Sequence, residues 1–324
     1  MKLTDLIKKG VETISELYPE VEAKEMVFAY FDDVFGFKRH THILEPELEI
    51  PGQDVVKVLG DFARMAVGEP LQYVTGKAFF YGREFRVSPD VLIPRQETEL
   101  LIGSLLSSLP PKTLAFPAVR HPLAGGGMSS PSFAENNDQQ TKTPVRILDL
   151  CTGSGCIAWT LALEIPSSEV TAVDISEGAL GVASRQDFTE EYARTGALPP
   201  LFVNADVLKG PQPFIEAYGD GKFNIIVSNP PYVMDKEKAL MRMNVLDHEP
   251  HLALFVPDDD PLVFYRAVAG WAMELLADDG IGIVEINEAL GEDTAQVFRD
   301  CGFSQVAVVK DLHEKDRFVK FIKK

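Results

Sequence analysis

Apolar residues recur at helical spacing through the start of the chain. The pattern predicts one helix in the segment that ends near Pro19, a second over Glu20 to Phe35 and a third from Pro51 through Val67. Thr4 is the expected N-cap of the first helix, because its hydroxyl can accept a hydrogen bond from a free backbone amide. We therefore expect a small all-helical domain over residues 1–76.

Beyond the helical segment the pattern changes to aromatic and β-branched residues. These surround Gly82-Arg83 within the stretch Lys77 to Val87, which predicts a β-hairpin. A further helix is expected from about Glu97 to Leu109. We expect residues 77–94 to link the helical domain to a larger domain over residues 95–324.

The stretch from Pro110 to Pro144 has no periodic pattern. It is rich in Pro, Gly, Ser, Asn and Gln, a composition that buries too little apolar surface to offset the entropy of ordering the chain. We expect a flexible insertion over residues 110–144 of the larger domain.

From Val145 onward, short apolar runs alternate with helical patterns. Candidate strands are Val145–Leu150, Glu169–Val173, Leu201–Val203, Phe223–Val227 and Ile281–Ile286, with helices such as Ile157–Glu164 and Leu262–Leu276 between them. This alternation is typical of an α/β fold with a mostly parallel sheet, whose ligands lie at the carboxyl ends of the strands. Two last runs, Ser304–Val309 and Arg317–Ile322, predict a strand pair.

Composition narrows the class of protein. A chain of 324 residues, 45% of them hydrophobic, can form one large core and a smaller one. The 31 basic and 49 acidic residues give a net charge of −18, which argues against binding a nucleic-acid backbone. The three cysteines lack metal-type spacing and predict neither a disulfide framework nor a metal site. Without a bilayer-length apolar span or a signal-like N-terminus, we expect a cytoplasmic protein.

A glycine turn follows the first predicted strand of the α/β region. Asp149 lies near the strand end, and Cys151-Thr152-Gly153-Ser154-Gly155 leads into the next helix. Glycines let a ligand approach the backbone, and the helix N-terminus offers unpaired amides. The second strand ends at Asp174-Ile175, whose carboxylate can bind ribose hydroxyls. A plain strand–turn–helix is the alternative, but the two acids favour an adenosyl-binding site.

The third and fourth predicted strands also end in polar groups. Asp206-Val207 can meet an adenine ring, or can simply form an acidic turn. Asn229-Pro230-Pro231-Tyr232 cannot continue a sheet, because each proline lacks a donor and has a fixed φ. The Asn229 side-chain oxygen and the Pro230 carbonyl can accept both hydrogens of a planar NH2 group, while Tyr232 covers its face. An ordinary proline-rich loop is the alternative.

This ordered set of strand ends resembles the class I S-adenosylmethionine-dependent methyltransferases, whose amino-directed members carry an Asn-Pro-Pro-Tyr type of motif after the fourth strand. More narrowly, the chain resembles the HemK/PrmC family of protein-(glutamine-N5) methyltransferases, which act on peptide-chain release factors. The segments that carry the narrower resemblance are Gly68–Gly76, Phe80–Val87, Val91–Glu99, Ile147–Ala158, Val173–Ser176, Ser228–Val233, Glu249-Pro250, Ala253-Leu254 and Asp316–Val319.

The resemblance implies a Rossmann-like methyltransferase domain behind a helical substrate-recognition domain. It also implies methyl transfer from S-adenosyl-L-methionine, leaving S-adenosyl-L-homocysteine, to the glutamine N5 of the Gly-Gly-Gln loop in class 1 release factors, which tunes translation termination. The expected partner is thus a protein. We expect no metal, no direct nucleic-acid contact, no membrane contact and a monomeric chain.

The strand ends and the resemblance together name the candidate site residues. The catalytic candidates are Asn229, Pro230 and Tyr232, and the substrate-binding candidates are these three with Pro231 and Glu249. The cofactor-binding candidates are Arg95, Asp149, Cys151, Thr152, Gly153, Ser154, Gly155, Asp174, Ile175, Asp206, Val207 and Asn229. Glu249 can instead form a surface ion pair, and Arg95 can merely precede a helix whose first turn holds an acid.

The sequence departs from the family pattern at several positions. Gln96 stands where the family usually has proline, and Cys151 stands where it usually has glycine. Cysteine is acceptable at that position on the ground that it is small and polarizable. The acidic stretch Phe255 to Asp260 replaces a turn that is often glycine-rich, and the 110–144 insertion has no counterpart.

Two other functions fit the same residues. One is an adenine-N6 methyltransferase acting on DNA or RNA, because the exocyclic amine of adenine is the same kind of planar NH2 group. Such an enzyme must also hold phosphates, which the charge of −18 opposes. An inactive cofactor-binding adaptor is the second alternative. The intact Asn229–Tyr232 motif argues against it.

Overall fold

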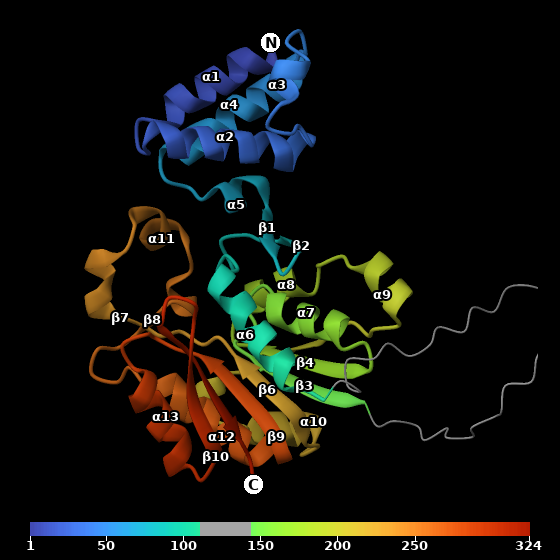
Figure 1. The fold of residues 1–324 in the computed structure, drawn as a ribbon, viewed down its shortest axis with the longest axis vertical. Coiled ribbons are helices and arrows are strands. Elements are labelled where there is room, and N and C mark those ends of the chain that lie inside the picture. Colours follow the sequence, from blue (N-terminus) through green and yellow to red (C-terminus); the bar gives the residue numbers. More distant parts are fainter. Residues whose placement is uncertain (111–143) are drawn as a thin grey trace, which may run out of the picture.

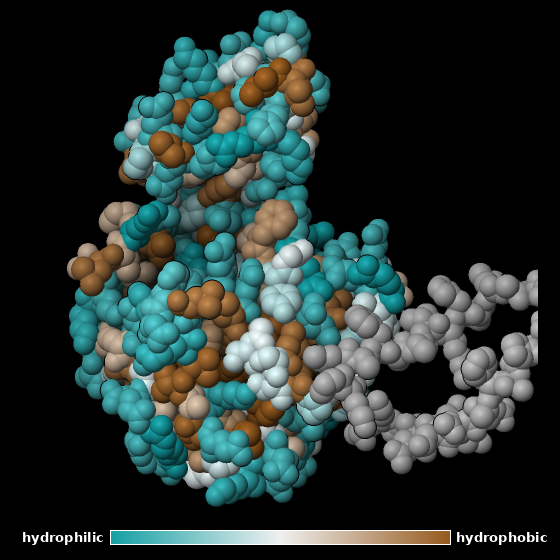
Figure 2. Space-filling model, in the orientation of Figure 1, coloured by the Kyte–Doolittle hydropathy of each residue, from teal (hydrophilic) through white to brown (hydrophobic). Residues whose placement is uncertain are grey.

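The computed structural model describes residues 1–110 and 144–324. The expected insertion over residues 110–144 therefore lies, apart from its two end residues, outside the described part of the chain. In those described ranges, no helix is both long enough and apolar enough to span a bilayer. Figure 2 shows two lobes joined through a narrower region.

The smaller lobe consists of the N-terminal helices (Figure 1). They are α1 (Leu3–Ile14), α2 (Glu20–Phe35), α3 (Thr41–Leu44), α4 (Gly52–Ala66) and α5 (Leu71–Thr75). The helices pack around a core of their own that includes Tyr30 and Phe62, and the Tyr30 hydroxyl donates to Asp61 at 2.7 Å. The expected cap at Thr4 is wrong, because α1 already begins at Leu3, whose burial fixes the start of the helix.

The linker is the expected antiparallel hairpin, formed by β1 (Lys77–Phe80) and β2 (Arg83–Arg86). Residues of the linker contact both lobes. The Tyr73 hydroxyl of α5 donates to the Val91 carbonyl at 2.6 Å, and both residues pack in a small apolar cluster with residues of α8 (Glu177–Ala183). On the other side, Arg83 of β2 is bound at 2.8 Å by each of two glutamates, Glu164 and Glu191.

The larger lobe is the predicted α/β fold, built on a seven-stranded sheet. Its strands are β3 (Val145–Leu150), β4 (Ser168–Asp174), β5 (Leu201–Asn204), β6 (Phe223–Ser228), β9 (Leu276–Glu285), β10 (Ser304–Lys310) and β11 (Asp316–Ile322). The order across the sheet is β10-β11-β9-β6-β3-β4-β5, and β11 alone runs in the direction opposite to the other six strands. Chain order reverses between β3 and β6, the point at which α/β sheets bind ligands.

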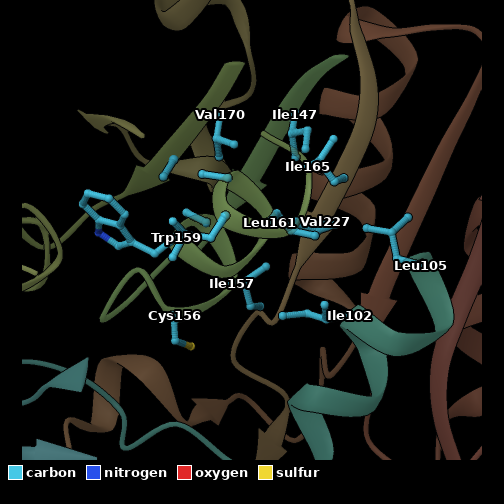
Figure 3. Close-up of a cluster of buried hydrophobic side chains, with 14 of the residues drawn as sticks. Ile102, Leu105, Ile147, Cys156, Ile157, Trp159, Leu161, Ile165, Val170 and Val227 are labelled. Carbon is cyan, nitrogen blue, oxygen red and sulfur yellow. The ribbon is translucent and has the colours of Figure 1, made fainter. Parts of the chain in front are cut away.

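Helices cover both faces of this sheet. On one face lie α6 (Gln96–Ser108) and α7 (Cys156–Glu164), and on the other lie α12 (Val263–Leu275) and α13 (Gly291–Asp300). Figure 3 shows Ile102 and Leu105 of α6 pointing toward Ile157, Leu161 and the strand residue Val227. This packing holds α6 against the sheet, close to the carboxyl ends of the strands.

Several short elements connect the larger ones without having been predicted. They are α8, α9 (Thr189–Thr195), η1 (Val207–Lys209), α10 (Gln212–Tyr218), β7 (Val233–Met234), η2 (Asp235–Leu240), α11 (Met243–His248), η3 (His251–Ala253) and β8 (Phe255–Val256), while α13 was also missed. The strand β7 directly follows the Asn229–Tyr232 motif and pairs in parallel with β8. The acidic stretch from Phe255 thus begins as a strand.

Candidate functional site

The glycine turn after β3 places backbone close to the centre of the sheet edge. Gly153 and Gly155 have φ values of 55° and 78°, so both use the left-handed conformation that favours glycine. A Cβ at Gly155 would lie 3.0 Å from that of Ala183 and 3.3 Å from the Phe202 ring. Cys151 is also left-handed, with a φ of 62°. Burial raises the pKa of its thiol well above the ordinary value, which keeps the sulfur neutral.

Asp149 stabilises this turn through a hydrogen bond with Thr152. It is fully buried, and the Thr152 hydroxyl donates to its Oδ2 at 2.6 Å. Burial, with a smaller contribution from the charge of Asp174, raises the pKa of Asp149 to about 7, while the Thr152 hydrogen bond opposes the shift. Asp149 lines neither of the two cavities described below, and its hydrogen bond with Thr152 connects it to the larger one.

Asp174 joins the ends of the first two strands of the sheet. Its Oδ2 accepts from the Gly153 amide at 2.8 Å and its Oδ1 from the Ser176 amide at 2.9 Å. Burial raises the pKa of this carboxyl, and the backbone donors act against that rise. A carboxylate has about four acceptor positions, so two remain for a ligand in the cavity that Asp174 lines.

Asp206 follows β5 and is both a turn residue and a residue that lines the larger cavity. Its Oδ1 accepts from the Leu208 amide at 3.0 Å and caps the short helix η1, so it is a turn residue. Asp206 and Val207 also line the cavity. Asn204 supports this edge, because its side-chain amide donates to the Asp174 and Ile175 carbonyls at 3.2 and 2.8 Å.

The Asn229–Tyr232 motif begins where β6 ends. The Asn229 Nδ2 donates to the Thr98 Oγ1 of α6 at 3.1 Å. Among the described residues, no backbone hydrogen bond is made to the Pro230 carbonyl, as expected for a turn that leaves the sheet. Tyr232 is held at both ends: its hydroxyl donates to Glu285 at 3.0 Å, and its carbonyl accepts from the Asn287 side chain at 3.2 Å.

Glu285 is a buried carboxylate that sequence reasoning missed. It ends β9, is 2% exposed, and its Oε2 accepts from the Thr98 hydroxyl at 2.7 Å. Burial raises its pKa, and hydrogen bonds from Thr98 and Tyr232 act in the opposite direction. Thr98 lies inside the Val91–Glu99 segment that carries the family resemblance, which was a signal that could have drawn attention to it.

Two cavities meet at Asn229. The larger has a volume of about 190 Å³ and the smaller about 50 Å³. Both are lined by Leu92, Arg95, Asn229 and Ala253. Of the other predicted residues, the larger is lined by Cys151, Thr152, Gly153, Ser154, Asp174, Ile175, Asp206, Val207 and Pro231, and the smaller by Pro230 and Tyr232. Gly155, Asp149 and Glu249 line neither, while Asp90, Ile157, Leu208 and Phe264 line the larger without having been predicted.

Arg95 and Glu249 form one unit beside the smaller cavity. The guanidinium donates to both Glu249 oxygens at 2.7 and 2.8 Å, and the Ile93 amide donates to Oε2 at 3.3 Å. Glu249 is 4% exposed while the Arg95 side chain is 35% exposed, so the ion pair is half-buried, with its carboxylate inside the protein. The acidic stretch turns away from this wall: Asp258 accepts from the Lys236 amide and Asp260 pairs with Arg266.

The larger cavity suits an adenosyl group by its chemistry. Two carboxylates, Asp174 and Asp206, can accept from hydroxyl or amino groups, and apolar side chains such as Ile157, Val207 and Phe264 can cover a ring. The carboxylates also favour a cationic ligand. In the part of the chain that the structure describes, no group of three or more His, Cys, Asp or Glu side chains is arranged to hold a metal ion.

Comparison with known proteins agrees with this chemistry. The family model described as "Methyltransferase small domain" matches residues 132–251. A release factor glutamine methyltransferase of Bacteroides thetaiotaomicron is 34% identical over 308 residues, covering 95% of this chain and 95% of that protein. One of Flavobacterium psychrophilum is 30% identical over 310 residues, covering 96% and 95%.

A solved structure and a longer relative extend the comparison. The crystal structure of a release factor-specific protein-(glutamine-N5) methyltransferase of Alicyclobacillus acidocaldarius is 26% identical, covers 74% of this chain and 99% of that chain, and has a TM-score of 0.40. A bifunctional methyltransferase of Rickettsia felis is 37% identical over 257 residues, covering 78% of this chain and 45% of that protein.

Proposed function

Because the chain belongs to the family of release factor glutamine methyltransferases, we propose that it transfers a methyl group from S-adenosylmethionine to the glutamine N5 in the Gly-Gly-Gln loop of class 1 release factors. The observation that carries the proposal is the meeting of two cavities at Asn229. One is large enough for part of a nucleoside cofactor and the other suits a single small side chain. The acceptor groups of the motif lie at their junction.

The larger cavity is the proposed cofactor site. Asp174 and Asp206 bind polar groups of the adenosyl moiety, and Val207 supports the ring. The Gly153 turn brings backbone within reach of the ligand, with Arg95 and Asn229 closing the side that faces the substrate. S-adenosylmethionine supplies an electrophilic methyl group on a positively charged sulfur.

The smaller cavity is the proposed substrate site. The lone pair of an amide nitrogen is delocalised into its carbonyl, so the nitrogen is a poor nucleophile. The Asn229 Oδ1 and the Pro230 carbonyl accept its two hydrogens and favour the positive charge that develops as it reacts. The Tyr232 ring lies against the amide plane and fixes its direction toward the methyl group. No strong base is required.

Glu249 acts on the substrate site through Arg95. Its two oxygens hold the guanidinium, and Arg95 lines both cavities. Glu249 also accepts from the Ile93 amide, so it connects the linker to the segment after α11. The pair therefore fixes the wall that the cofactor and the substrate share.

The partner is proposed to dock across the narrower region between the lobes. The helical domain over 1–76 recognises the release factor, and the linker over 77–94 sets its position relative to the catalytic domain over 95–324. The α11 segment faces the helices, since Arg242 pairs with Glu22 of α2 at 3.0 Å. Leu240 and Met243, 88% and 64% exposed, are apolar groups free for contact. We further propose a cytoplasmic monomer without direct nucleic-acid contact.

Intact-mass measurement tests this function. Incubation of the chain with S-adenosylmethionine and a class 1 release factor is expected to add one methyl group, and peptide mapping is expected to place it on the glutamine of the Gly-Gly-Gln loop. A release factor with alanine in place of that glutamine is the control and should stay unmodified. Label entering DNA or RNA while the release factor remained unchanged would overturn the proposal in favour of the adenine-N6 alternative.

Asn229→Ala tests the assigned chemistry. Loss of one acceptor at the reacting amide is expected to lower kcat by about 100-fold to 1,000-fold, by analogy with the loss of one preorganised donor in other enzymes. Calorimetric affinity for S-adenosylmethionine is expected to stay within a few-fold of the wild type. A variant that lost cofactor affinity but kept kcat at saturating cofactor would contradict the role given to Asn229.

A further inference from the structure

A continuous hydrogen-bond chain lies behind the motif. It runs from the Asn229 Nδ2 to the Thr98 Oγ1 at 3.1 Å, from the Thr98 hydroxyl to the Glu285 Oε2 at 2.7 Å, and from the Tyr232 hydroxyl to the Glu285 Oε1 at 3.0 Å. Its members come from the end of β6, from α6 and from the end of β9. Thr98 and Glu285 are both 2% exposed, so water does not compete for the bond between them, while the bonds of Asn229 and Tyr232 are partly buried.

The direction of each bond in this chain is fixed by Glu285. A carboxylate offers acceptors only, so the single hydroxyl hydrogen of Thr98 must point toward it. Thr98 then has only lone pairs left for Asn229, and these accept from the Asn229 NH2 group. The other polar atom of the same amide, its Oδ1, is then not bound by Thr98 and is left for a ligand in the cavities that Asn229 lines; Thr98 itself lines the larger of the two.

Shape alone does not determine this orientation. The oxygen and nitrogen of an asparagine amide are nearly equal in size, and a half-turn about the last torsion exchanges them. In the exchanged orientation, Asn229 would point two hydrogens at the two hydrogens of a substrate amide. The site would then repel the group that it must bind, although every side chain filled the same space.

The environment of Glu285 is consistent with a role beyond stability. Its two partners are neutral hydroxyls, and burial raises the free energy of the charged form. Arg317, whose charge acts on Glu285, is itself bound to Asp311 at 2.8 Å and to Glu288 at 3.6 Å. A neutral side chain of the same shape would be less costly to bury.

We propose that Glu285, acting through Thr98, is a positioning residue that fixes the amide of Asn229 with its oxygen toward the substrate. Its second oxygen holds Tyr232 against the same substrate group. The inference rests on the proposed function, because it concerns how the same site distinguishes an amide NH2 from a carboxylate. It adds two residues that touch neither reacting atom.

Glu285→Gln is the decisive substitution. It keeps the shape of the side chain but adds an NH2 group, which can donate to Thr98 and so send the Thr98 hydrogen toward Asn229. We expect kcat to fall about 100-fold with cofactor affinity and melting temperature close to wild type. The matched control is Glu288→Gln, which removes the same charge from a 47% exposed side chain nearby and is expected to retain wild-type kcat.

A change of specificity separates positioning from simple structural support. With the Asn229 amide reversed, the pocket offers hydrogen-bond donors, which favour a carboxylate over an amide. Binding of a release factor with a Gly-Gly-Glu loop, measured by inhibition, is compared with binding of the unmethylated Gly-Gly-Gln form. The preference for the Glu loop should be stronger in Glu285→Gln than in wild type. Thr98→Val is expected to lose turnover as Glu285→Gln does, and Thr98→Ser is expected to retain most of it. Wild-type kcat in Glu285→Gln, or unchanged discrimination between the two loops, would overturn the inference.

The two proposals fail in different ways. If the wild-type chain methylates the release factor but Glu285→Gln does so equally well, only the positioning role is lost. If wild type methylates a different amine, the proposed substrate is wrong. The same variants can then be compared on that amine, where a fall in kcat with intact cofactor binding still supports the polarity of Asn229.

Discussion

Cys151 occupies a backbone conformation that any side chain disfavours. By size alone, cysteine is acceptable at this position, where the family usually has glycine. The structure shows that size is not the main cost, since Cys151 has a φ of 62°. A left-handed residue with a Cβ costs roughly 1–2 kcal/mol. The strain lies directly at the turn proposed to contact the cofactor.

A comparison of Cys151→Gly with Cys151→Ala isolates this cost. Both variants lose the sulfur, but only glycine relaxes the backbone. After allowing for the greater freedom of glycine in the unfolded chain, we expect the Gly variant to be more stable than the Ala variant by about 0.5–1 kcal/mol. Urea unfolding measures the difference. At Cys156, which has no positive φ, the order should reverse; the same order at both positions would refute the account.

Sequence patterns indicated which residues come together at the cavities where one motif supplies one group. The predicted strand ends do line the cavities, because parallel strands place their carboxyl ends at one edge. Their supporting partners were missed. Thr98 and Glu285 are 187 positions apart, and only the packing of α6 on the sheet brings them into contact. No local pattern marks such a pair.

Among the elements, β9 is constrained by close packing against its neighbour β11. A Cβ at Gly282 would lie 2.1 Å from the Phe321 ring. That ring is fully buried and stacked on Phe298 at 4.1 Å, so it has little room to move. Glycine at this strand position therefore permits the approach of an aromatic side chain.

We expect Gly282→Ala to destabilise the protein by about 1–3 kcal/mol, as overpacked cores do. Gly270→Ala is the matched control, because Gly270 lies in α12, is exposed, and has open space at the position of its Cβ. There alanine should stabilise by about 0.5–1 kcal/mol. Chemical denaturation of both variants checks the opposite signs, and a neutral Gly282→Ala would show that Phe321 repacks freely.

The long elements were predictable and the short ones were not. Helix α2 and strand β3 have the predicted limits, because each carries a full periodic pattern bounded by clear breakers. In contrast, β7 and β8 have two residues each, too few for any pattern, and form only because the fold brings them together. The start of β9 at Leu276, before the predicted Ile281, follows from pairing with β6 across an irregular register.

At the scale of the whole molecule, the helical lobe has a core separate from those of the sheet. Phe62 and Tyr30 belong to this helical core, whereas the two faces of the sheet have their own clusters. The linker cluster around Tyr73 and Val91 lies between them. This division supports the proposed boundary near residue 76.

Phe62→Ala tests whether the lobes unfold independently. Loss of a large buried aromatic typically costs about 3–5 kcal/mol, and Phe62 is 1% exposed. We expect calorimetry to show an early transition for the helical lobe, while cofactor affinity measured below the later transition stays unchanged. Phe298→Ala, which removes the same group beneath the sheet, should instead lower the later transition. One cooperative transition in both variants would contradict the domain division.

The parallel contact of β7 with β8 has a consequence for how this enzyme family can diversify. Pairing of Val233 with Phe255 and of Met234 with Val256 holds together the two ends of the segment over residues 235–254. Closing a flexible loop costs only about 0.6 kcal/mol more for each doubling of its length. The part of this segment ahead of Glu249, residues 235–248, can therefore be lengthened, shortened or exchanged between homologues while partner preference changes. The Asn229–Tyr232 motif, Glu249 and Ala253 keep their places at the site.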